Sequence, residues 1–262
     1  MSPKEQLLER MNEMGVSPKR SLGQNFLVNQ NTIEKIVNRA SSFMPSKVVE
    51  VGPGLGALTE RMIQNSSDMI LIELDKEFSK YWSKRGLEVV EQDALKVDWK
   101  SLKLPPKTLF LSNLPYQISA RIVIERSVAP SEIESMVLMF QKEVAQRISA
   151  EPKNKDYGFL SVVAQMAWKI SKVTEAGPGD FYPKPRVASR VLSFERKREI
   201  SDEVVKFVKT AFTNRRKMML KAFGDQKDKV LPHLVSLGYN EKVRAEEISP
   251  DEFLELTKLM GI

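Results

Sequence analysis

Short apolar runs alternate with segments of helical spacing between residues 47 and 150, and this alternation restricts the fold more than any other feature of the chain. The apolar runs are, in order, KVVEV, MILIEL, EVVEQDAL, KTLFLSNL and ESMVLMFQ. Helical spacing follows in ALTERMI, DKEFSKYW and KEVAQRISA. Strands that alternate with helices build a parallel sheet that is covered on both faces. We therefore predict an α/β fold.

Segments on either side of this region complete the first part of the chain. Residues 1–20 indicate a short polar helix and a basic stretch, and residues 31–40 have helical spacing. Residues 167–177 and 186–197 have the composition of strands and flank a loop rich in Pro and Gly. Because the connection between them is so direct, we expect them to form an antiparallel edge of the sheet.

The β-rich runs stop after about residue 200. Helical apolar spacing covers residues 201–223, with Ser201 as a cap, and VLPHLVSLG and SPDEFLELTKLM indicate two more helices. The sequence therefore predicts a catalytic domain over residues 1–195 and a small all-helical domain over residues 196–262.

Composition limits the chemistry that is open to the 262-residue chain. A formal charge of +7 and a pI near 9.4 favour a polyanionic partner such as nucleic acid. The absence of Cys excludes disulfides, thiolate metal sites and a cysteine nucleophile, and we predict no metal site. The one histidine, His233, excludes mechanisms that need two imidazoles. No apolar run approaches the roughly 20 residues of a membrane span, so we expect a soluble, cytoplasmic protein.

A glycine-rich turn joins the first strand of the alternating region to its helix. VVEVGPGLGALTERM places Gly52, Gly54 and Gly56 there. Glycines at this junction let a ligand approach the backbone, although a tight turn also favours glycine. Glu50 lies just before them and Pro53 removes one N–H donor, so the turn suits a pyrophosphate poorly. It suits a cationic ligand without phosphate better.

Acidic residues end the next two strands. Glu73 lies about twenty residues after Gly52, where an acidic side chain binds both ribose hydroxyls of a nucleoside. Asp93 can accept a hydrogen bond from an adenine amino group. The alternatives are a surface carboxylate for Glu73 and a turn or cap for Asp93. A nucleoside with a positively charged tail and no phosphate describes S-adenosylmethionine, and ligands of such sheets bind at these strand ends.

The tetrapeptide Asn113-Leu114-Pro115-Tyr116 ends the fourth strand and faces the same crevice. Methyl transfer to an exocyclic amine requires the nitrogen lone pair to turn away from the ring and toward the methyl carbon. The Asn113 side chain and the Leu114 carbonyl can accept the two amine hydrogens and hold the nitrogen there. Pro115 fixes the backbone direction, and Tyr116 can stack on the base. The alternative is a Pro turn capped by Asn, with Tyr in the core.

Eight motifs occur in order between about residues 18 and 195. They are SLGQNFL, VVEVGPGLGALT, LIELD, QDAL, NLPYQIS, MFQKEVAQRI, DYGFLSVVAQ and FYPKPRVASRV, and FTNRRKMMLKAF follows them. Together they resemble the rRNA adenine N6,N6-dimethyltransferase family of the KsgA type. The resemblance implies a seven-stranded, Rossmann-like class I methyltransferase domain with a small C-terminal helical domain. It also implies S-adenosylmethionine as donor and two adjacent adenines in the 3′-terminal hairpin of 16S small-subunit rRNA as acceptors.

The same resemblance assigns cofactor contacts by position. The expected cofactor-binding residues are Gln24, Asn25 and Leu27 at the methionine end, Gly52 and Gly54 in the turn, Glu73 at the ribose, Asp93 at the adenine, and Asn113, which also serves the target amine. Phe181 matches a second aromatic that would sandwich the flipped base against Tyr116. By residue type alone, Phe181 reads as a core residue. Gln117 stands where many members have Asn, and we assign it no role.

Basic residues point to an RNA-binding surface. Residues 206–221 contain no acidic residue and six basic ones: Lys206, Lys209, Arg215, Arg216, Lys217 and Lys221. The cluster 215–217 can follow phosphates, with Lys221 beside it, and neutralising the cluster should weaken rRNA binding while sparing cofactor affinity. The alternative is a solvated helix face. Lys19, Arg20, Lys184 and Arg186 can extend the surface. The implied partners are small-subunit rRNA and the pre-30S particle, bound by a monomer.

Three other functions fit parts of the sequence. An Erm-type methyltransferase of 23S rRNA has motifs that nearly coincide with these, although QKEVAQRI and FYPKPRVASRV favour the small-subunit type. Methyltransferases of DNA adenine or of a protein glutamine usually carry a second Pro in the tetrapeptide, where this chain has Leu114. A non-catalytic ribosome-assembly factor on the same fold is the third alternative, and it does not require an intact set of acceptors at the strand ends.

Overall fold

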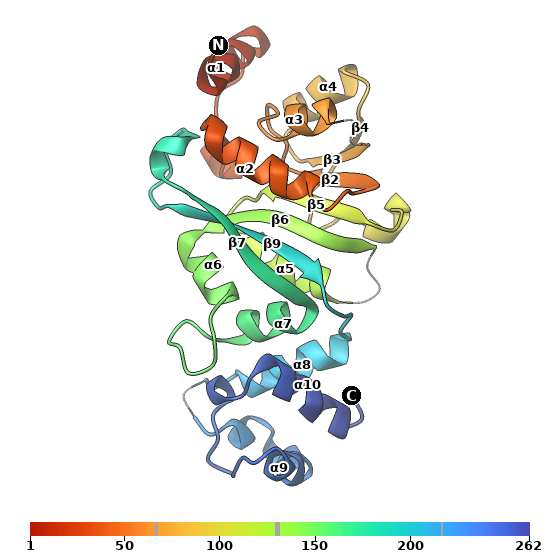
Figure 1. Cartoon of the computed structure of the whole chain (residues 1–262), viewed down its shortest axis with the longest axis vertical. Coiled ribbons are helices and arrows are strands. Elements are labelled where there is room, and N and C mark those ends of the chain that lie inside the picture. Colours follow the sequence, from red (N-terminus) through yellow and green to blue (C-terminus); the bar gives the residue numbers. More distant parts are fainter. Residues whose placement is uncertain (66–67, 129–131, 216) are drawn as a thin grey trace. The chain divides into compact units, whose positions relative to one another are not determined.

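The computed structural model of the protein describes residues 1–65, 68–128, 132–215 and 217–262. Their contacts divide the chain into two compact units. The sheet unit comprises Met1–Ile122, Glu132–Ala145 and Ile170–Glu195, and the helical unit comprises Val123–Ser131, Gln146–Lys169 and Arg196–Ile262. Figure 1 labels the elements of both.

A seven-stranded sheet with the order β4-β3-β2-β5-β6-β9-β7 carries the sheet unit. Its strands are β2 (Lys47–Val51), β3 (Met69–Glu73), β4 (Glu88–Glu91), β5 (Thr108–Asn113), β6 (Ile133–Gln141), β7 (Trp168–Ala176) and β9 (Ser189–Arg196). The pairs from β4 to β6 are parallel, and β9 is antiparallel to β6. The predicted α/β fold, the seven strands and the antiparallel edge are confirmed.

Helices follow the strands, and the sequence predicted all of them except the one over residues 119–127. They are α2 (Gln30–Ser41), α3 (Thr59–Gln64), α4 (Lys76–Lys84), α5 (Ser119–Ser127) and α6 (Lys142–Ile148). Helix α2 buries Ile33, Ile36 and Val37 on one face, and the Asn29 side chain caps its start by accepting from the Thr32 amide. All five residues of β3 are buried, as expected of a parallel strand that is covered on both faces.

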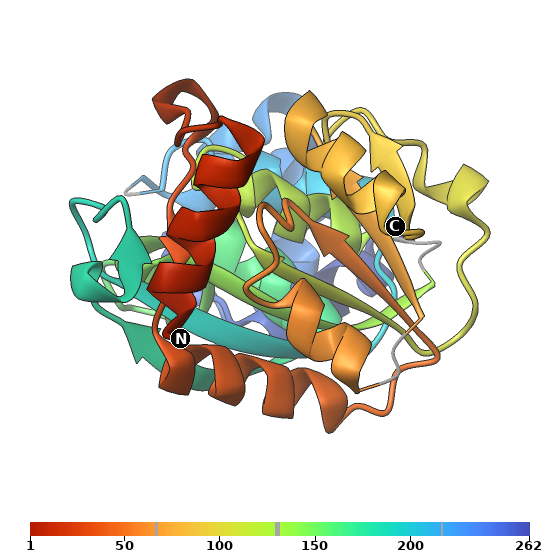
Figure 2. The same cartoon turned by 90° about the horizontal axis from the view of Figure 1, so that it is seen from above.

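Further elements precede and follow the main alternation. Helix α1 (Pro3–Met14), red in Figure 2, starts with a capping box between Ser2 and Glu5 and ends at Gly15, which has a φ of 63°. Strands β1 (Phe26–Leu27) and β8 (Phe181–Tyr182) form a separate antiparallel pair, in which Leu27 lies opposite Phe181. This pairing joins the GQNFL and FYPKPR motifs.

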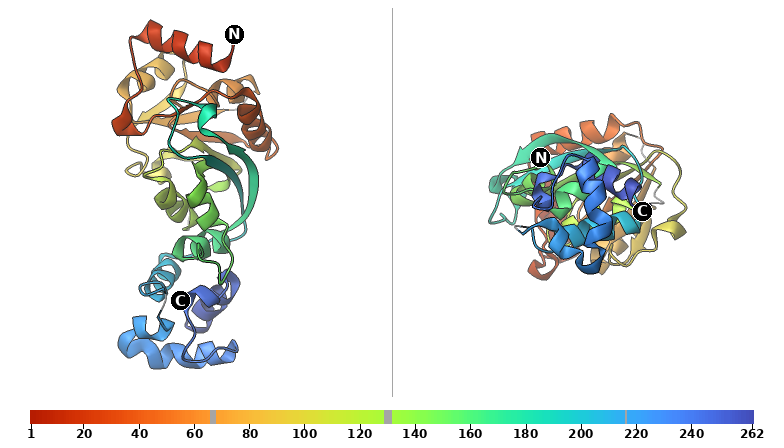
Figure 3. Two further views of the ribbon diagram at one scale, coloured as in Figure 1. Left: turned by 90° about the vertical axis from the view of Figure 1, so that its left-hand side faces the viewer. Right: turned by 90° about the horizontal axis from the view of Figure 1, so that it is seen from below.

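The helical unit contains α7 (Phe159–Ala167), α8 (Asp202–Ala211), α9 (Lys227–Ser236) and α10 (Pro250–Leu259), drawn from green to blue in Figure 3. Ser201 and Ser249 cap α8 and α10 as predicted. Helix α7, which was not predicted, packs on α8 and α10 with seven of its nine residues buried. The Tyr157 hydroxyl before α7 donates to the Ile248 carbonyl at 2.7 Å.

The predicted helix over residues 201–223 is shorter in the structure. It ends at Ala211, and the chain turns before a single 3-10 turn at Met219–Ala222. The Arg215 side chain anchors the chain after Ala211. Its Nε pairs with Glu246 Oε2 at 2.9 Å, and its Nη2 donates to the Asn154 carbonyl at 3.0 Å. These contacts tie the chain after α8 to two segments that are distant in sequence.

The remaining short helices are 3-10 turns at Arg20–Leu22, Trp99–Leu102, Pro178–Asp180, Gly224–Gln226 and Ala245–Glu247. None of the helices within the described ranges is long and apolar enough to cross a membrane. The contact boundary at residues 195/196 coincides with the predicted domain boundary, while 123–131 and 146–169 group with the C-terminal helices. The assignment of separate functions to 1–195 and 196–262 stays a prediction.

Candidate active site

A cavity of about 570 Å³ lies in the sheet unit, where β2, β3 and β5 end. It is lined by every residue that was predicted to bind the cofactor: Gln24, Asn25, Leu27, Gly52, Gly54, Glu73, Asp93 and Asn113. Leu114, Pro115, Tyr116 and Gln117 line it as well. Residues from four strand ends and from the segment before β1 therefore meet at one cavity, as ligand binding at the carboxyl edge of a parallel sheet requires.

The glycine turn between β2 and α3 adopts a backbone that only glycine enters readily. Gly52 has a φ of 66°, and a Cβ atom built on it would meet no atom within 4 Å, so the turn leaves space for a ligand there. Gly54 has a φ of 53°, and its Cβ would lie 2.8 Å from the Phe26 ring. The Gly54 carbonyl accepts from Trp82 Nε1 at 2.8 Å. The turn is thus closely packed on one side and open on the other.

Glu73 is buried, with 6% of its surface exposed, at the end of β3. Its Oε1 accepts from the Asp75 amide at 2.8 Å, and its Oε2 accepts from the Gly54 amide at 3.2 Å. Burial raises the pKa of Glu73, while these amides oppose the shift. Each carboxylate oxygen can accept a second hydrogen bond, so the geometry suits a ligand with two neighbouring hydroxyls.

Glu50 is a second buried carboxyl group at this cavity, with 2% of its surface exposed. Its Oε2 accepts from the Thr59 hydroxyl at 2.7 Å. Burial raises the pKa of Glu50 to about 8, and the neighbouring Glu73 adds to the shift. A cation beside Glu50 would favour its ionised form, which fits the cationic ligand that the sequence indicates.

Asp93 lies two residues beyond β4 and is half-buried. Its Oδ1 accepts from the Leu95 amide at 3.0 Å, a contact typical of the turn residue that the sequence analysis gave as the alternative. Asp93 also lines the cavity. Sequence reasoning missed the apolar lining beside these acids. Leu74, which follows Glu73, is 52% exposed, and Ala94 follows Asp93. The sequence could have indicated this apolar lining, because Leu74 and Ala94 directly follow the two acids.

The Asn113 side chain is oriented by a backbone contact. Its Nδ2 donates to the Asn25 carbonyl at 3.0 Å, which leaves Oδ1 on the opposite side of the amide as an acceptor. The Asn25 side chain in turn donates to the Gly23 carbonyl at 3.0 Å. The Tyr116 hydroxyl lies 2.9 Å from Ser189 Oγ, and burial raises the pKa of Tyr116. The segment before β1 and strand β9 therefore set the positions of the two polar groups in the tetrapeptide.

Two residues make contacts that the resemblance does not imply. Gln24 lines the cavity, but its side chain bridges the Lys19 amide at 2.8 Å and Asp75 Oδ2 at 2.9 Å. Phe181 is 2% exposed within the hydrophobic core that contains Leu27, and it is not among the residues that line the cavity. This core position is the one that residue type alone predicts, and its role in stacking stays a prediction.

The basic residues differ in their exposure and in their ion-pair contacts. Lys206, Lys209, Lys217 and Lys221 are exposed in the helical unit, whereas Arg215 holds Glu246 and the Asn154 carbonyl. Arg216 and the Arg20 side chain lie outside the described residues. In the sheet unit, Lys184 and Arg186 are exposed, and Lys19 pairs with Asp75 at 2.8 Å. Across the described ranges, no group of three or more His, Asp or Glu could hold a metal ion.

The sequence is similar to proteins over its full length. A protein from Bdellovibrio bacteriovorus named ribosomal RNA small subunit methyltransferase A is 48% identical over 275 residues, which cover 100% of this chain and 99% of that protein. A protein of the same name from Mycoplasmoides gallisepticum is 37% identical over 248 residues, which cover 92% of each.

Solved structures share the fold. A dimethyladenosine transferase from Plasmodium falciparum has a TM-score of 0.76 at 25% identity, with 90% of this chain and 97% of that one covered. The 23S rRNA methyltransferase ErmE has a TM-score of 0.66 at 23% identity, with 91% and 100% covered. The sequence profile of the family described as ribosomal RNA adenine dimethylase matches residues 15–261. The chain belongs to the ribosomal RNA adenine dimethylase family.

Proposed function

We propose that this protein transfers methyl groups from S-adenosylmethionine to the exocyclic amines of two adjacent adenines in the 3′-terminal hairpin of 16S rRNA, during biogenesis of the small subunit. The observation that carries the proposal is the orientation of Asn113 at the cavity. Its Nδ2 is held by the Asn25 carbonyl, so its Oδ1 is available to an amine donor. The relatives named for small-subunit rRNA methylation support the choice of substrate.

The cavity fits the proposed cofactor through its donors, acceptors and space. Gly52 leaves room for close approach, Glu73 would accept from the ribose hydroxyls, and Asp93 from the adenine amine. Leu74 would pack on the adenine ring, and Glu50 would be ionised beside the positive charge. When bound, S-adenosylmethionine supplies an electrophilic methyl carbon.

The residues at the end of β5 would orient the nucleophile. Asn113 Oδ1 and the Leu114 carbonyl accept the two hydrogens of the adenine amine and turn its lone pair toward the methyl carbon. No strong base is needed before transfer, because the amine becomes acidic only as it is methylated. After the first transfer the amine keeps one hydrogen, so one of the two acceptors loses its partner in the second transfer. Tyr116 would stack on the flipped base, with its hydroxyl tethered to Ser189.

The helical unit would hold RNA through exposed lysines. Lys206, Lys209, Lys217 and Lys221 offer charges that pair with phosphates, and the net charge of +7 adds long-range attraction. We infer that the substrate is the pre-30S particle, and that the protein acts on it as a monomer in the cytoplasm.

Transfer of labelled methyl groups tests the proposal. Wild-type protein incubated with labelled S-adenosylmethionine and under-methylated small subunits should label two adjacent adenines, located by mapping of the modified bases. Asn113→Ala should lower the transfer rate by roughly 10²-fold or more, because the amine loses an acceptor, while most cofactor affinity remains through Gly52, Glu73 and Asp93. Bound cofactor without transfer by folded wild-type protein would overturn the enzymatic proposal and favour a non-catalytic assembly factor.

The shared fold with ErmE makes 23S rRNA the competing substrate to include. Large-subunit RNA should therefore be offered in a parallel reaction. Preferential labelling of the large-subunit RNA would replace 16S rRNA with the Erm-type alternative.

A further inference from the structure

Helix α1 forms one wall of the cavity. Pro3, Gln6, Leu7 and Arg10 all line it, although the family profile begins only at residue 15. Leu7 and Met11 are buried in a cluster with Phe26 and Leu55, so α1 is docked on the elements that build the site. The helix therefore contributes to the site from outside the segment that defines the family.

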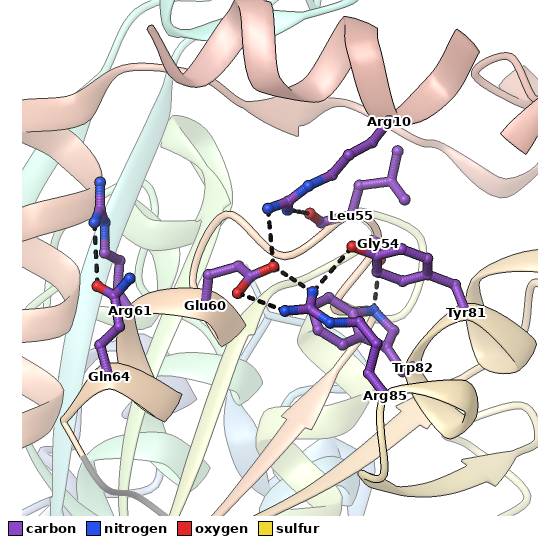
Figure 4. A network of polar contacts seen from close by, with 9 residues as sticks. All are labelled: Arg10, Gly54, Leu55, Glu60, Arg61, Gln64, Tyr81, Trp82 and Arg85. Atoms are coloured by element: carbon purple, nitrogen blue, oxygen red, sulfur yellow. Dashed lines mark hydrogen bonds and ion pairs between the residues drawn. The ribbon is translucent and has the colours of Figure 1, made fainter. Parts of the chain in front are cut away.

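Arg10 connects this helix to the glycine turn. Its Nη1 donates to the Leu55 carbonyl at 2.7 Å, and its Nη2 pairs with Glu60 Oε1 at 2.9 Å (Figure 4). The Arg10 side chain is 27% exposed and the Glu60 side chain 21%, so water screens the pair only in part. Hydrogen bonds from a guanidinium to a carbonyl and a carboxylate are among the stronger ones in proteins.

Helix α4 holds the turn from another side. Trp82 Nε1 donates to the Gly54 carbonyl at 2.8 Å, and Arg85 pairs with Glu60 while its guanidinium lies 5.0 Å from the centre of the Trp82 ring (Figure 4). Two successive carbonyls of the turn are thus bound by side chains from two helices. The α4 contact involves a fully buried Trp, whereas the α1 contact comes from an Arg10 side chain that is 27% exposed.

We propose that helix α1 acts as a latch on the cofactor cavity, with Arg10 as the positioning residue that keeps the latch closed and the glycine turn aligned. This inference rests on the proposed function, because it concerns the same cavity. Detaching α1 removes one wall of the cavity, so the latch would limit how fast cofactor and its demethylated product leave. Arg10 touches the turn and not the target amine, so it should affect cofactor exchange more than the transfer step.

Arg10→Ala tests the latch, with Arg10→Lys as the conservative variant and Arg39→Ala as a matched control. Arg39 pairs with Glu195 at 2.7 Å in the same unit, with a side-chain exposure of 30%, but it does not line the cavity. Stopped-flow displacement of S-adenosylhomocysteine measures its release rate, and steady-state assays separate KM for S-adenosylmethionine from kcat.

Arg10→Ala should release S-adenosylhomocysteine roughly 10- to 100-fold faster, as expected for the loss of charged hydrogen bonds. KM for S-adenosylmethionine should rise, and kcat at saturation should stay within about threefold. Arg10→Lys should recover part of the effect, since one ammonium can reach one acceptor but lacks the planar fork. Amide hydrogen exchange in residues 52–58 should increase in Arg10→Ala and stay unchanged in Arg39→Ala.

The measured release rates distinguish a failure of the proposed function from a failure of the latch. If wild-type protein binds neither S-adenosylmethionine nor S-adenosylhomocysteine, the proposed function fails. If wild-type protein binds both and Arg10→Ala releases S-adenosylhomocysteine at the wild-type rate, the latch is wrong. An equal acceleration in Arg39→Ala would also overturn it, because the effect would then follow from general destabilisation of the sheet unit.

Discussion

Glu50→Gln replaces a buried carboxyl group by an amide of nearly the same shape. The amide oxygen can still accept from the Thr59 hydroxyl, which lies 2.7 Å from the carboxylate oxygen in the wild-type protein. The substitution removes the ability to ionise and little else. It therefore isolates the effect of burying an acid that shares its cavity with Glu73.

The sign and size of the effect follow from the two pKa values. Burial raises the pKa of Glu50 from 4.5 to about 8 in the folded protein. Between these values the unfolded chain loses its proton while the folded protein keeps it, so the contribution to stability is full below pH 4.5 and is lost as pH rises toward 8. The free energy of unfolding should fall by about 1.4 kcal/mol per pH unit, or about 5 kcal/mol across this window.

Urea unfolding of both proteins at pH 5.0, 6.0, 7.0 and 7.5, followed by the intrinsic fluorescence of Trp82, Trp99 and Trp168, measures this term. Glu50→Gln lacks it, so the stability of the variant relative to wild type should increase by about 3 kcal/mol between pH 5.0 and 7.5. Titrating groups that do not interact with Glu50 contribute equally to both proteins and cancel in the difference. If the two stability curves run parallel over this range, Glu50 is ionised in the folded protein and the reasoning is refuted.

Three further substitutions test the site and the helical unit. Gly54→Ala should lower the free energy of unfolding by about 1–3 kcal/mol, because the new Cβ would lie 2.8 Å from the Phe26 ring at a positive φ; an unchanged urea midpoint would contradict this. Replacing Lys217 and Lys221 together by Gln should reduce the slope of log affinity for small-subunit RNA against log salt by roughly 1.5, with cofactor affinity unchanged. Arg215→Ala should lower stability by about 1–2 kcal/mol, seen as a lower melting temperature, since it removes an ion pair and a hydrogen bond to the backbone.

Local patterns in the sequence predicted the elements that form the cavity. The apolar runs before Gly52, Glu73 and Asn113 became β2, β3 and β5 because such residues pack well in a sheet covered on both faces. Once the strands are parallel, their carboxyl ends lie at one edge, so residues far apart in the sequence are brought together by topology alone. The strand-end candidates Gly52, Glu73, Asp93 and Asn113 could therefore be listed from residue patterns, and they line one cavity with Gln24, Asn25 and Leu27, which the family resemblance implied.

Longer-range contacts decided the features that were missed or shortened. Helix α7 is apolar on nearly all sides, and its burial comes from packing on α8 and α10. The segment after Ala211 keeps helical spacing, yet Arg215 turns the chain by bonding to Asn154 and Glu246. Neither partner is near in sequence, so no local window reports these contacts.

The sequence by itself determined the alternation of strands and helices, the glycine turn, and the acceptors at the strand ends, because each depends on residue type and short spacing. Only the tertiary structure decided that Glu50 has a pKa near 8 and that Arg10 reaches the Leu55 carbonyl across 45 positions of sequence. Burial and hydrogen-bond pairing are properties of the surroundings, and the surroundings exist only once the chain has folded.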